Sequence, residues 1–420
     1  MEGIHEDQRR LLRGPWLTRR RLQERQDRQG PPHRRGAPAA GRGRVTLAAR
    51  LPEYPWDELA PIAEKARAFP GGVVDLSIGT PVDPVPAVIQ DALRAAANAP
   101  GYPLTAGTPE LRAAAAGWLS RSHGVDVDPV TVLPVIGTKE FIAWLPTMLG
   151  LGSGDTVLYP DLAYPTYNIG ARLAGAASAP VDDLSDDALG AAPASARLRW
   201  VNSPSNPSGR VLNAETLRSG VALARSRGCV LASDECYIEL GWDVTPVSVL
   251  HPSVRGGSLD GVLAVFSLSK RSNLAGYRAG FVTGDPGLMK ELLLIGRQAG
   301  MIVPGPVQAA MTVALSDDAH AAEQKARYAA RRAVLTEGLT AAGFRIEHSE
   351  AGLYVWATRP GLDCWAACEL LAAECGMLVG PGSFYGPAGN SYIRVALTAT
   401  DERVAAAGER LRALASRPAR

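Results

Sequence analysis

The feature that most constrains the fold is an alternation of short apolar runs with longer amphipathic stretches between residues 84 and 300. The apolar runs have the length and β-branched content of strands, and the stretches between them have the length of helices. This alternation predicts an α/β fold, with a mostly parallel sheet covered by helices on both faces. We expect strands at 131–136, 155–159, 198–202, 229–233, 262–267 and 279–283, and helices at 108–122, 139–150, 165–174, 213–227 and 286–300.

The pattern differs before and after this region. Further elements are expected as a helix at 57–68, a strand at 73–78, a long helix at about 306–342, strands within 343–357, a helix at 363–375, a strand at 391–397 and a helix from Asp401, with Thr400 as its N-cap. We therefore predict four segments: an extension at 1–44, an arm and helix at 45–75 that packs with the small domain, a large domain at 76–305 and a small α+β domain at 306–420.

Residues 1–44 contain twelve arginines against five acidic residues, with Pro-Pro and Gly-rich stretches and no apolar period. This composition favours a disordered extension, although a basic arm can also bind nucleic acid or act as a targeting peptide. A start of translation near Val45 is a further hypothesis. The five cysteines, an odd number without a secretory signal, predict free thiols in a reducing compartment, the cytoplasm. The lack of a run of about 18 apolar residues argues against a membrane span.

Only five lysines occur in the chain, so each can be considered separately. Lys65, Lys290 and Lys325 lie in polar helix faces, where a solvated surface charge is the simple interpretation. Lys139 and Lys270 follow predicted strands, and the carboxyl ends of parallel strands are where α/β sheets bind ligands. Lys270, in SLSKRSNLAGYR (267–278), could form a Schiff base with a carbonyl cofactor. Ser-x-x-Lys also occurs in serine acyl-enzymes, so its neighbours must decide.

Those neighbours match the needs of a phosphorylated pyridine cofactor. Ser267 and Arg278 could hold a phosphate, and the helix start in IGTKE (136–140) offers free N–H groups for the same anion. Asp234 could pair with a protonated ring nitrogen. The ring could accept hydrogen bonds from Tyr237 and Asn206, and Tyr164 could stack on it. Each residue also has a structural interpretation: Asn206 could form a plain turn, Asp234 could cap a helix and Tyr164 could pack in the core.

Together these elements resemble the class I/II aminotransferases, which are fold-type I pyridoxal 5'-phosphate enzymes. The resemblance covers about residues 50–415 and rests on the order of seven separated elements: Tyr102 in GYPLTAGTPELR, Gly137-Thr138-Lys139, Tyr164, Asn206 in NSPSNPSG, Asp234 with Tyr237, Ser267-x-x-Lys270 with Arg278, and Arg394 in YIRVAL. It implies a large domain with a mostly parallel sheet, a smaller α+β domain and no metal. Cys364 and Cys368, which lack a nearby His, are interpreted as packing residues.

The resemblance also implies a role for each matched residue. Lys270 would bind the cofactor covalently and later move the substrate proton, while Asp234 would keep the ring nitrogen protonated. Asn206 and Tyr237 would bind the ring's phenolic oxygen, and Tyr164 would stack on the ring. The phosphate would be held by Gly137, Thr138, Lys139, Ser267 and Arg278. The substrate would be bound by Arg394 through its carboxylate, by the backbone of Gly79 and by Asn206. Tyr102 would reach the cofactor of the other subunit, which implies a homodimer with shared sites.

A closer resemblance is to the actinobacterial N-succinyldiaminopimelate aminotransferases of lysine biosynthesis. It rests on runs such as LPEYPWDELA (51–60), VDLSIGTPVDPVP (74–86) and VIGTKEFIAWLPTMLGLG (135–152). The implied reaction exchanges an amino group between N-succinyl-L,L-diaminopimelate and 2-oxoglutarate. Lys139 or residues near Trp144 are candidates to bind the second anionic group of these substrates. Alternatives are another amino-acid specificity (alanine, aspartate or aromatic), a C–S β-lyase, or a non-enzymatic transcription regulator of the same fold.

Overall fold

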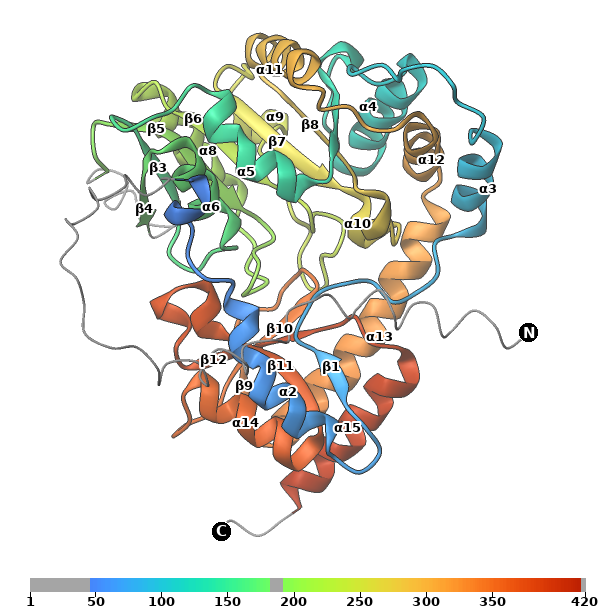
Figure 1. The fold of residues 1–420 in the computed structure, drawn as a ribbon, viewed down its shortest axis with the longest axis vertical. Coiled ribbons are helices and arrows are strands. Elements are labelled where there is room, and N and C mark those ends of the chain that lie inside the picture. The colour runs from blue at the N-terminus through green and yellow to red at the C-terminus, as the bar shows by residue number, and fades with distance from the viewer. Residues whose placement is uncertain (1–45, 182–191, 417–420) are drawn as a thin grey trace, which may run out of the picture. The chain divides into compact units, whose positions relative to one another are not determined.

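The computed structural model describes residues 46–181 and 192–416, so the extension predicted at 1–44 lies outside the described residues. The described residues form two sheets, each with its own helices (Figure 1). The strands are β1 (Val74–Leu76), β2 (Leu133–Ile136), β3 (Thr156–Pro160), β4 (Ala177–Val181), β5 (Ala196–Asn202), β6 (Val230–Asp234), β7 (Val262–Ser267), β8 (Ala279–Gly284), β9 (Arg345–Ile346), β10 (Tyr354–Thr358), β11 (Met377–Pro381) and β12 (Tyr392–Ala396).

The helices fill the intervals that the sequence predicts and add a few short ones. The α-helices are α2 (Ala60–Arg67), α3 (Ala87–Ala95), α4 (Pro109–His123), α5 (Thr138–Met148), α6 (Thr166–Ala174), α8 (Ala214–Ser226), α9 (Pro252–Arg255), α10 (Leu268–Arg271), α11 (Pro286–Ala299), α12 (Gly305–Ser316), α13 (Ala319–Ala341), α14 (Cys364–Cys375) and α15 (Asp401–Ala415). The 3-10 turns are η1 (Leu47–Arg50), η2 (Pro55–Leu59), η3 (Pro129–Thr131), η4 (Ala275–Tyr277), η5 (Gly382–Tyr385) and η6 (Pro387–Gly389). No helix in the described ranges is long and apolar enough to span a membrane.

The large sheet has the order β2-β8-β7-β6-β5-β3-β4. The strands from β7 to β4 pair in parallel, whereas β8 pairs antiparallel with both β7 and β2. The predicted, mostly parallel sheet is therefore confirmed, with β8 as the one strand that runs against the others. Because β2 and β7 flank β8 and are both antiparallel to it, β2 runs in the same direction as β7.

Two apolar cores cover the two faces of this sheet. Side chains such as Phe141 of α5 and Leu292 of α11 pack on one face together with α6. Helices α4, α8, α9 and α12 pack on the other face, where Trp118 of α4 is almost fully buried. The predicted cap of α15 is confirmed, since the side chain of Thr400 accepts from the backbone N–H of Arg403. Thr108 caps α4 in the same way, by accepting from the backbone N–H of Leu111.

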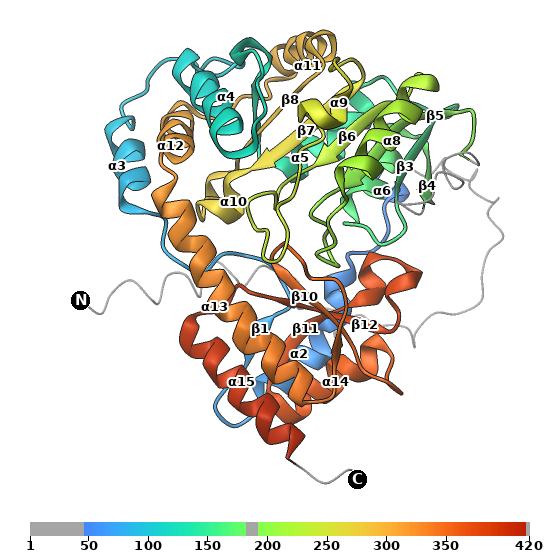
Figure 2. The same ribbon diagram turned by 180° about the vertical axis from the view of Figure 1, so that it is seen from behind.

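The small sheet has the order β1-β11-β12-β10-β9 and packs with α2, α13, α14 and α15. Its edge strand β1 lies parallel to β11, so a segment near the start of the described chain completes a sheet formed mainly by the C-terminal part. Helix α13 runs from the large-sheet side to the small-sheet side in both views (Figures 1 and 2). The four segment boundaries that the sequence suggests stay predictions.

The prediction of one long helix at 306–342 is wrong, because the helix is interrupted between α12 and α13. Asp317 has extended backbone angles, φ −112° and ψ 110°, and cannot continue α12. Its carboxylate accepts a hydrogen bond from the backbone N–H of Ala319, at 2.9 Å, and so starts the next helix. An Asp side chain that satisfies a free N–H at a helix start competes with helix continuation, and apolar periodicity does not reveal this competition.

A buried ion pair ties the segment after β1 to α13 and α15. Both terminal nitrogens of Arg331 donate to the Asp83 carboxylate, at 2.6 and 2.8 Å, and its Nε donates to Asp401 at 2.7 Å. The side chains of Arg331 and Asp83 are only 2% and 7% exposed. Burial alone would raise the pKa of Asp83, but the hydrogen bonds from Arg331, Gln324 and Arg327 lower it below its ordinary value.

Removing the buried cation should therefore destabilise the fold. We expect Arg331→Met to lower the free energy of unfolding by about 3 kcal/mol at pH 7, because Asp83 is left without its main partner. Arg327→Met, which removes a half-exposed contact of 3.3 Å to the same carboxylate, should cost less than about 1 kcal/mol. Urea unfolding measures both.

The pH dependence follows from the direction of the Asp83 shift. Since the folded-state pKa lies below the unfolded value, the stabilisation is present at neutral pH and is lost as the pH falls through the folded-state pKa. The difference between wild type and Arg331→Met should shrink over that acidic range. Equal losses in the two variants at pH 7 would contradict the account.

Candidate active site

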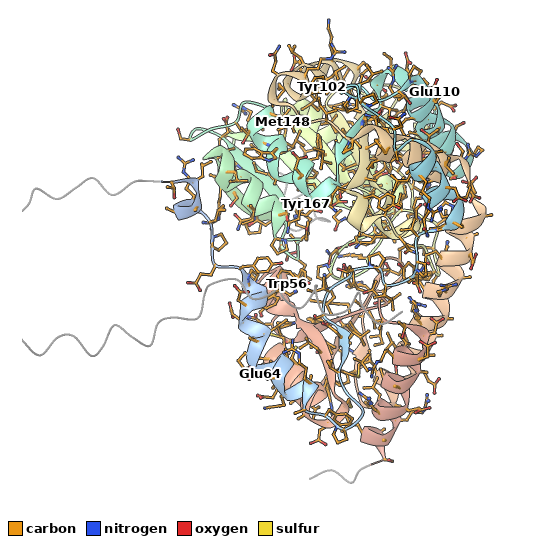
Figure 3. The ribbon with its side chains drawn as sticks, turned by 45° about the vertical axis from the view of Figure 1, so that its right-hand side comes forward. Trp56, Glu64, Tyr102, Glu110, Met148 and Tyr167 are labelled. Carbon is orange, nitrogen blue, oxygen red and sulfur yellow. The ribbon has the colours of Figure 1, made fainter. Side chains whose placement is uncertain are left out.

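A cavity of about 1280 Å³ lies at the carboxyl edge of the large sheet and also reaches side chains of the small sheet. It brings together all the site residues that the sequence predicts except Gly137 and Tyr102: Gly79, Thr138, Lys139, Tyr164, Asn206, Asp234, Tyr237, Ser267, Lys270, Arg278 and Arg394. Figure 3 labels two side chains near this region, Tyr167 on the large-sheet side and Trp56 on the small-sheet side. The predicted residues therefore come from many elements but face one space.

Strand direction explains why residues distant in sequence meet here. Asp234 ends β6 and Ser267 ends β7, and these two strands are parallel neighbours. The antiparallel β8 begins at this same edge, since Ser267 pairs with Gly280, and so Arg278 just before β8 joins them. β2 also ends at this edge, where Ile136 pairs with Ala279 and Gly137 follows.

Lys270 lies on α10, the one-turn helix that follows β7, and its amine contacts the carbonyl oxygen of Gly79. Burial lowers the pKa of Lys270 below its ordinary value, and the positive charges of Arg394 and Arg278 add to the lowering. A lysine with a lowered pKa supplies more of the neutral amine, which is the nucleophilic and basic form.

Asp234 is a buried carboxylate with neutral partners. It accepts hydrogen bonds from the hydroxyl of Tyr167, at 2.8 Å, and from the backbone N–H of Cys236, at 3.2 Å. Burial raises the pKa of Asp234, and these hydrogen bonds oppose the rise in part. No ion pair joins it to a cationic side chain of the described chain. A buried carboxylate in this position suits a ligand that brings its own protonated nitrogen.

Its neighbour Glu235 is a second buried carboxyl, which the sequence analysis did not single out. Its Oε1 accepts from the backbone N–H of Val249 at 2.7 Å, and burial raises the pKa of Glu235 to about 7. Glu235 does not line the cavity, so Asp234 is the carboxylate of this pair that a ligand can reach.

An anion seat forms where α5 begins. Gly137 has a positive φ of 73°, and a Cβ at this position would lie 2.2 Å from a terminal nitrogen of Arg278. Only glycine therefore allows the Arg278 guanidinium to lie against the first turn of α5, which carries Thr138. Free N–H groups of a helix start, a hydroxyl and a guanidinium together form a good phosphate site. Ser267 also faces the cavity, and its hydroxyl accepts from the N–H of Ser269, at 3.1 Å, as the cap of α10.

Arg394 of β12 is buried and is held by groups that follow β5 of the large sheet and β1 of the small sheet. It donates to Oδ1 of Asn206 at 3.0 Å and to the carbonyl oxygen of Ser77 at 2.7 Å. Its guanidinium lies 4.0 Å from the ring centre of Tyr354 and 4.8 Å from that of Tyr385. Its Nε is buried without a hydrogen-bond partner among the described residues. A fixed guanidinium with no carboxylate partner in the described chain suits a carboxylate ligand.

Three tyrosines in and around this cavity were missed by the sequence analysis. Tyr167 holds Asp234, and the hydroxyl of Tyr354 lies 3.2 Å from that of Tyr237. Burial alone would raise the pKa of Tyr354, but the positive charges of Arg394 and Lys270 lower it below its ordinary value. The ring of Tyr385 also contacts the guanidinium of Arg394. Tyr167, in DLAYPTY, was within reach of motif reasoning, whereas Tyr354 and Tyr385 follow only from packing of the small sheet.

Of the remaining predicted residues, Tyr164 and Lys139 line the cavity, whereas Tyr102 lies outside it. Tyr164 lines the cavity, and burial raises its pKa to about 12, so it stays a neutral phenol. Lys139 lines the cavity, but Trp144 does not. Tyr102 is 99% exposed and lies outside the cavity, on the large-sheet side in Figure 3. Cys364 and Cys368 are buried free thiols, as expected of packing residues.

Comparisons with known proteins were made for the whole chain. Residues 71–411 match the model of the family described as aminotransferase class I and II. A transaminase of Streptomyces rimosus, 4-dedimethylamino-4-oxo-anhydrotetracycline transaminase OxyQ, is 60% identical over 86% of this chain and 99% of its own length. The probable aminotransferase Rv1178 of Mycobacterium tuberculosis is 55% identical over 98% of this chain and 100% of its own length.

A solved structure extends the comparison to the fold. The probable N-succinyldiaminopimelate aminotransferase of Thermus thermophilus superimposes with a TM-score of 0.76. It is 29% identical, and the match covers 86% of this chain and 99% of that chain.

Proposed function

The chain belongs to the class I and II aminotransferases, which use pyridoxal 5'-phosphate, and we propose that it aminates 2-oxoglutarate with N-succinyl-L,L-diaminopimelate as the donor. The family supplies the reaction type, the transfer of an amino group between an amino acid and a 2-oxo acid. The named substrate is supported by the runs of sequence at 51–60, 74–86 and 135–152 and by the likeness to the Thermus thermophilus enzyme.

The residues present fit pyridoxal phosphate on three independent points. The seat around Gly137 has no room for a Cβ, the carboxylate of Asp234 is buried with neutral partners, and the amine of Lys270 has a lowered pKa. We propose that Thr138, Ser267 and Arg278 hold the phosphate, with Lys139 at the rim. Asp234 would hold the proton on the ring nitrogen, and Tyr164 would stack on the ring.

The polar groups between the two sheets would orient the ring and the substrate. Arg394 donates to Oδ1 of Asn206, so the amide N–H₂ of Asn206 remains available to donate to the ring's phenolic oxygen. Tyr237 would donate to the same oxygen, and burial raises the pKa of Tyr237 well above its ordinary value, which keeps it a donor. Arg394 would bind the substrate α-carboxylate, while Gly79 would approach the substrate with its backbone.

The chemistry needs an acidic α-carbon proton and a base placed beside it. Pyridoxal phosphate, when bound, withdraws electrons from the substrate's α-carbon, which no side chain can do. Lys270 would take the proton from that carbon as a neutral amine and deliver it to the C4′ carbon of the cofactor, which its lowered pKa favours. Because Arg394 fixes the carboxylate on the same carbon, the proton would be held within reach of Lys270.

A second candidate substrate is a polycyclic ketone. It is favoured by the 60% identity to OxyQ, whose name describes a 4-oxo-anhydrotetracycline as its substrate. An amino-acid donor would still be needed, so the roles of Lys270 and Arg394 would be unchanged. The two candidates differ in the half-reaction that they enter, since the first is an amino donor and the second an amino acceptor. The ring ketone also has no α-carboxylate, so Arg394 would bind only the amino-acid donor in that case.

The role of Lys270 predicts a large effect on turnover. Lys270→Ala should lower kcat by at least about 10³-fold, the range expected for loss of a positioned base. Lys290→Ala, which removes an exposed lysine on α11, should keep wild-type kcat. The measurement is steady-state transamination with saturating pyridoxal phosphate. Residual turnover within tenfold of wild type in Lys270→Ala would refute the assignment.

Substrate choice is tested by a panel of donors with 2-oxoglutarate as the acceptor. We expect kcat/KM for N-succinyl-L,L-diaminopimelate to exceed that for L,L-diaminopimelate, alanine, aspartate and tyrosine by about 100-fold. The reason is that the site would bind the succinyl amide, which the other donors lack. Equal values would remove the succinylated substrate but leave the transaminase intact. Amination of a 4-oxo-anhydrotetracycline with higher kcat/KM would favour the second candidate, and pyruvate release from a cysteine conjugate would indicate a β-lyase.

We propose a homodimer in which the hydroxyl of the exposed Tyr102 reaches the phosphate site of the second copy. A cytoplasmic location is proposed separately, from the free cysteines. Light scattering should then give twice the 44.2 kDa chain mass. Tyr102→Phe should weaken pyridoxal phosphate binding about tenfold, the worth of one hydrogen bond to a charged group. Tyr159→Phe, a half-buried tyrosine on β3, serves as the control. A monomer that binds the cofactor with wild-type affinity would contradict this proposal.

A further inference from the structure

The active-site cavity has an aromatic wall to which the proposed cofactor and α-carboxylate contacts assign no role. Its volume, about 1280 Å³, exceeds the roughly 300–1,000 Å³ typical of a small-molecule site. Part of the cavity wall is lined by Tyr54, Trp56, Trp365 and Phe384. We call these four side chains the aromatic strip, and they come from the residues around η2, from α14 and from η5.

The aromatic strip forms one connected series of rings. The ring centres of Tyr54 and Trp56 lie 5.5 Å apart, those of Trp56 and Phe384 5.1 Å apart, and those of Phe384 and Trp365 5.7 Å apart. These distances are typical of favourable aromatic pairs, so the rings hold one another in place. Trp56, Trp365 and Phe384 also pack against the core of the small sheet, which makes the strip a fixed wall.

The strip is continuous with the carboxylate end of the site. The ring centres of Trp56 and Tyr385 lie 6.5 Å apart, and the ring centre of Tyr385 lies 4.8 Å from the guanidinium carbon of Arg394. A substrate whose α-carboxylate is bound at Arg394 therefore has the strip beside the far part of its own chain. Tyr54, at 56% exposure, marks the outer end of the series.

Charge distinguishes this wall from the rest of the cavity. The cations that line the cavity in the described chain are Lys139, Lys270, Arg278 and Arg394, and none of them lies in the segments that form the strip. Those segments contribute two carboxylates instead, Glu53 and Glu58. The wall therefore disfavours a second carboxylate in contact with the rings and favours a planar, uncharged group.

We propose that the aromatic strip is the subsite for the distal part of the substrate, and that it selects long amino acids that carry a planar uncharged group, an amide or an aromatic ring, beyond the α-carbon. This inference rests on the proposed function for the position of the α-carboxylate at Arg394. In an N-acylated diaminopimelate the amide plane would stack on the strip. The carboxylate on the amide-bearing carbon and the terminal carboxylate of a succinyl group would both point away from the rings, toward solvent beyond Tyr54. A polycyclic ring system would occupy the same wall.

Equilibrium binding tests the subsite without requiring turnover. The probes are 6-benzamidohexanoate and hexanoate, which share the carboxylate and the chain but lack an amino group, so neither can be transaminated. Calorimetry on the holoenzyme should show that benzamidohexanoate binds at least tenfold more tightly, and that Trp56→Ala and Phe384→Leu each reduce this ratio about tenfold. Trp242→Ala, a half-buried tryptophan that lies outside this cavity and donates to the carbonyl of Gly352, should keep the wild-type ratio.

The kinetic counterpart uses Nε-benzoyl-lysine, Nε-acetyl-lysine and alanine as donors with 2-oxoglutarate. In the wild type, kcat/KM should be highest for Nε-benzoyl-lysine, lower for Nε-acetyl-lysine and lowest for alanine. In Trp56→Ala and Phe384→Leu the differences in kcat/KM among these donors should be smaller. A binding ratio that is the same in wild type, the strip variants and Trp242→Ala would overturn the subsite. Loss of transamination with all donors, while the binding ratio still responds to the strip, would instead remove the proposed function and leave the subsite. Phe384→Leu, which conserves an apolar side chain, covers the case in which Trp56→Ala fails to fold.

Discussion

The direction of one strand determines how this site is assembled. The parallel strands β6 and β7 bring Asp234 and Ser267 to one edge of the large sheet, but the anion seat needs two further elements at that edge. The antiparallel β8 provides both, because it begins beside Arg278 and restores β2 to the direction of β7. If β8 ran parallel to β7, its amino end and Arg278 would lie at the opposite edge, about 20 Å away for a strand of this length.

The second constraint is the burial of charge. Asp234 and Arg394 are buried and Lys270 is half-buried beside one cavity, and within the described chain none of them has an ion-pair partner of opposite charge. Such an arrangement is costly in an empty site, because isolated buried charges are poorly compensated. The costs are offset when a ligand supplies a carbonyl for the amine, a protonated nitrogen for Asp234 and a carboxylate for Arg394. The rings of Tyr354 and Tyr385 both contact the guanidinium and help to keep it in place.

The sequence predicted most elements of the large sheet because apolar runs and helical stretches alternate there. It did not predict β4, whose ASAPV sequence lacks a strand pattern and whose one partner is β3. It did not predict the break at Asp317, because a local side-chain bond decides that point. Within the site, motif order located the residues around Lys270, whereas Tyr354 and the aromatic strip depend on how the small sheet packs against the large one, which no local pattern encodes.

In the proposals made above, the small sheet would select the substrate and the large sheet would hold the cofactor. The most direct test of the central claim is to treat the holoenzyme with borohydride, which fixes pyridoxal phosphate on the lysine that binds it, and to map the label by peptide mass spectrometry. The account predicts a label on Lys270 and none on Lys139, the other lysine that lines the cavity. A label on Lys139, or no labelled lysine in a protein that holds the cofactor, would contradict it.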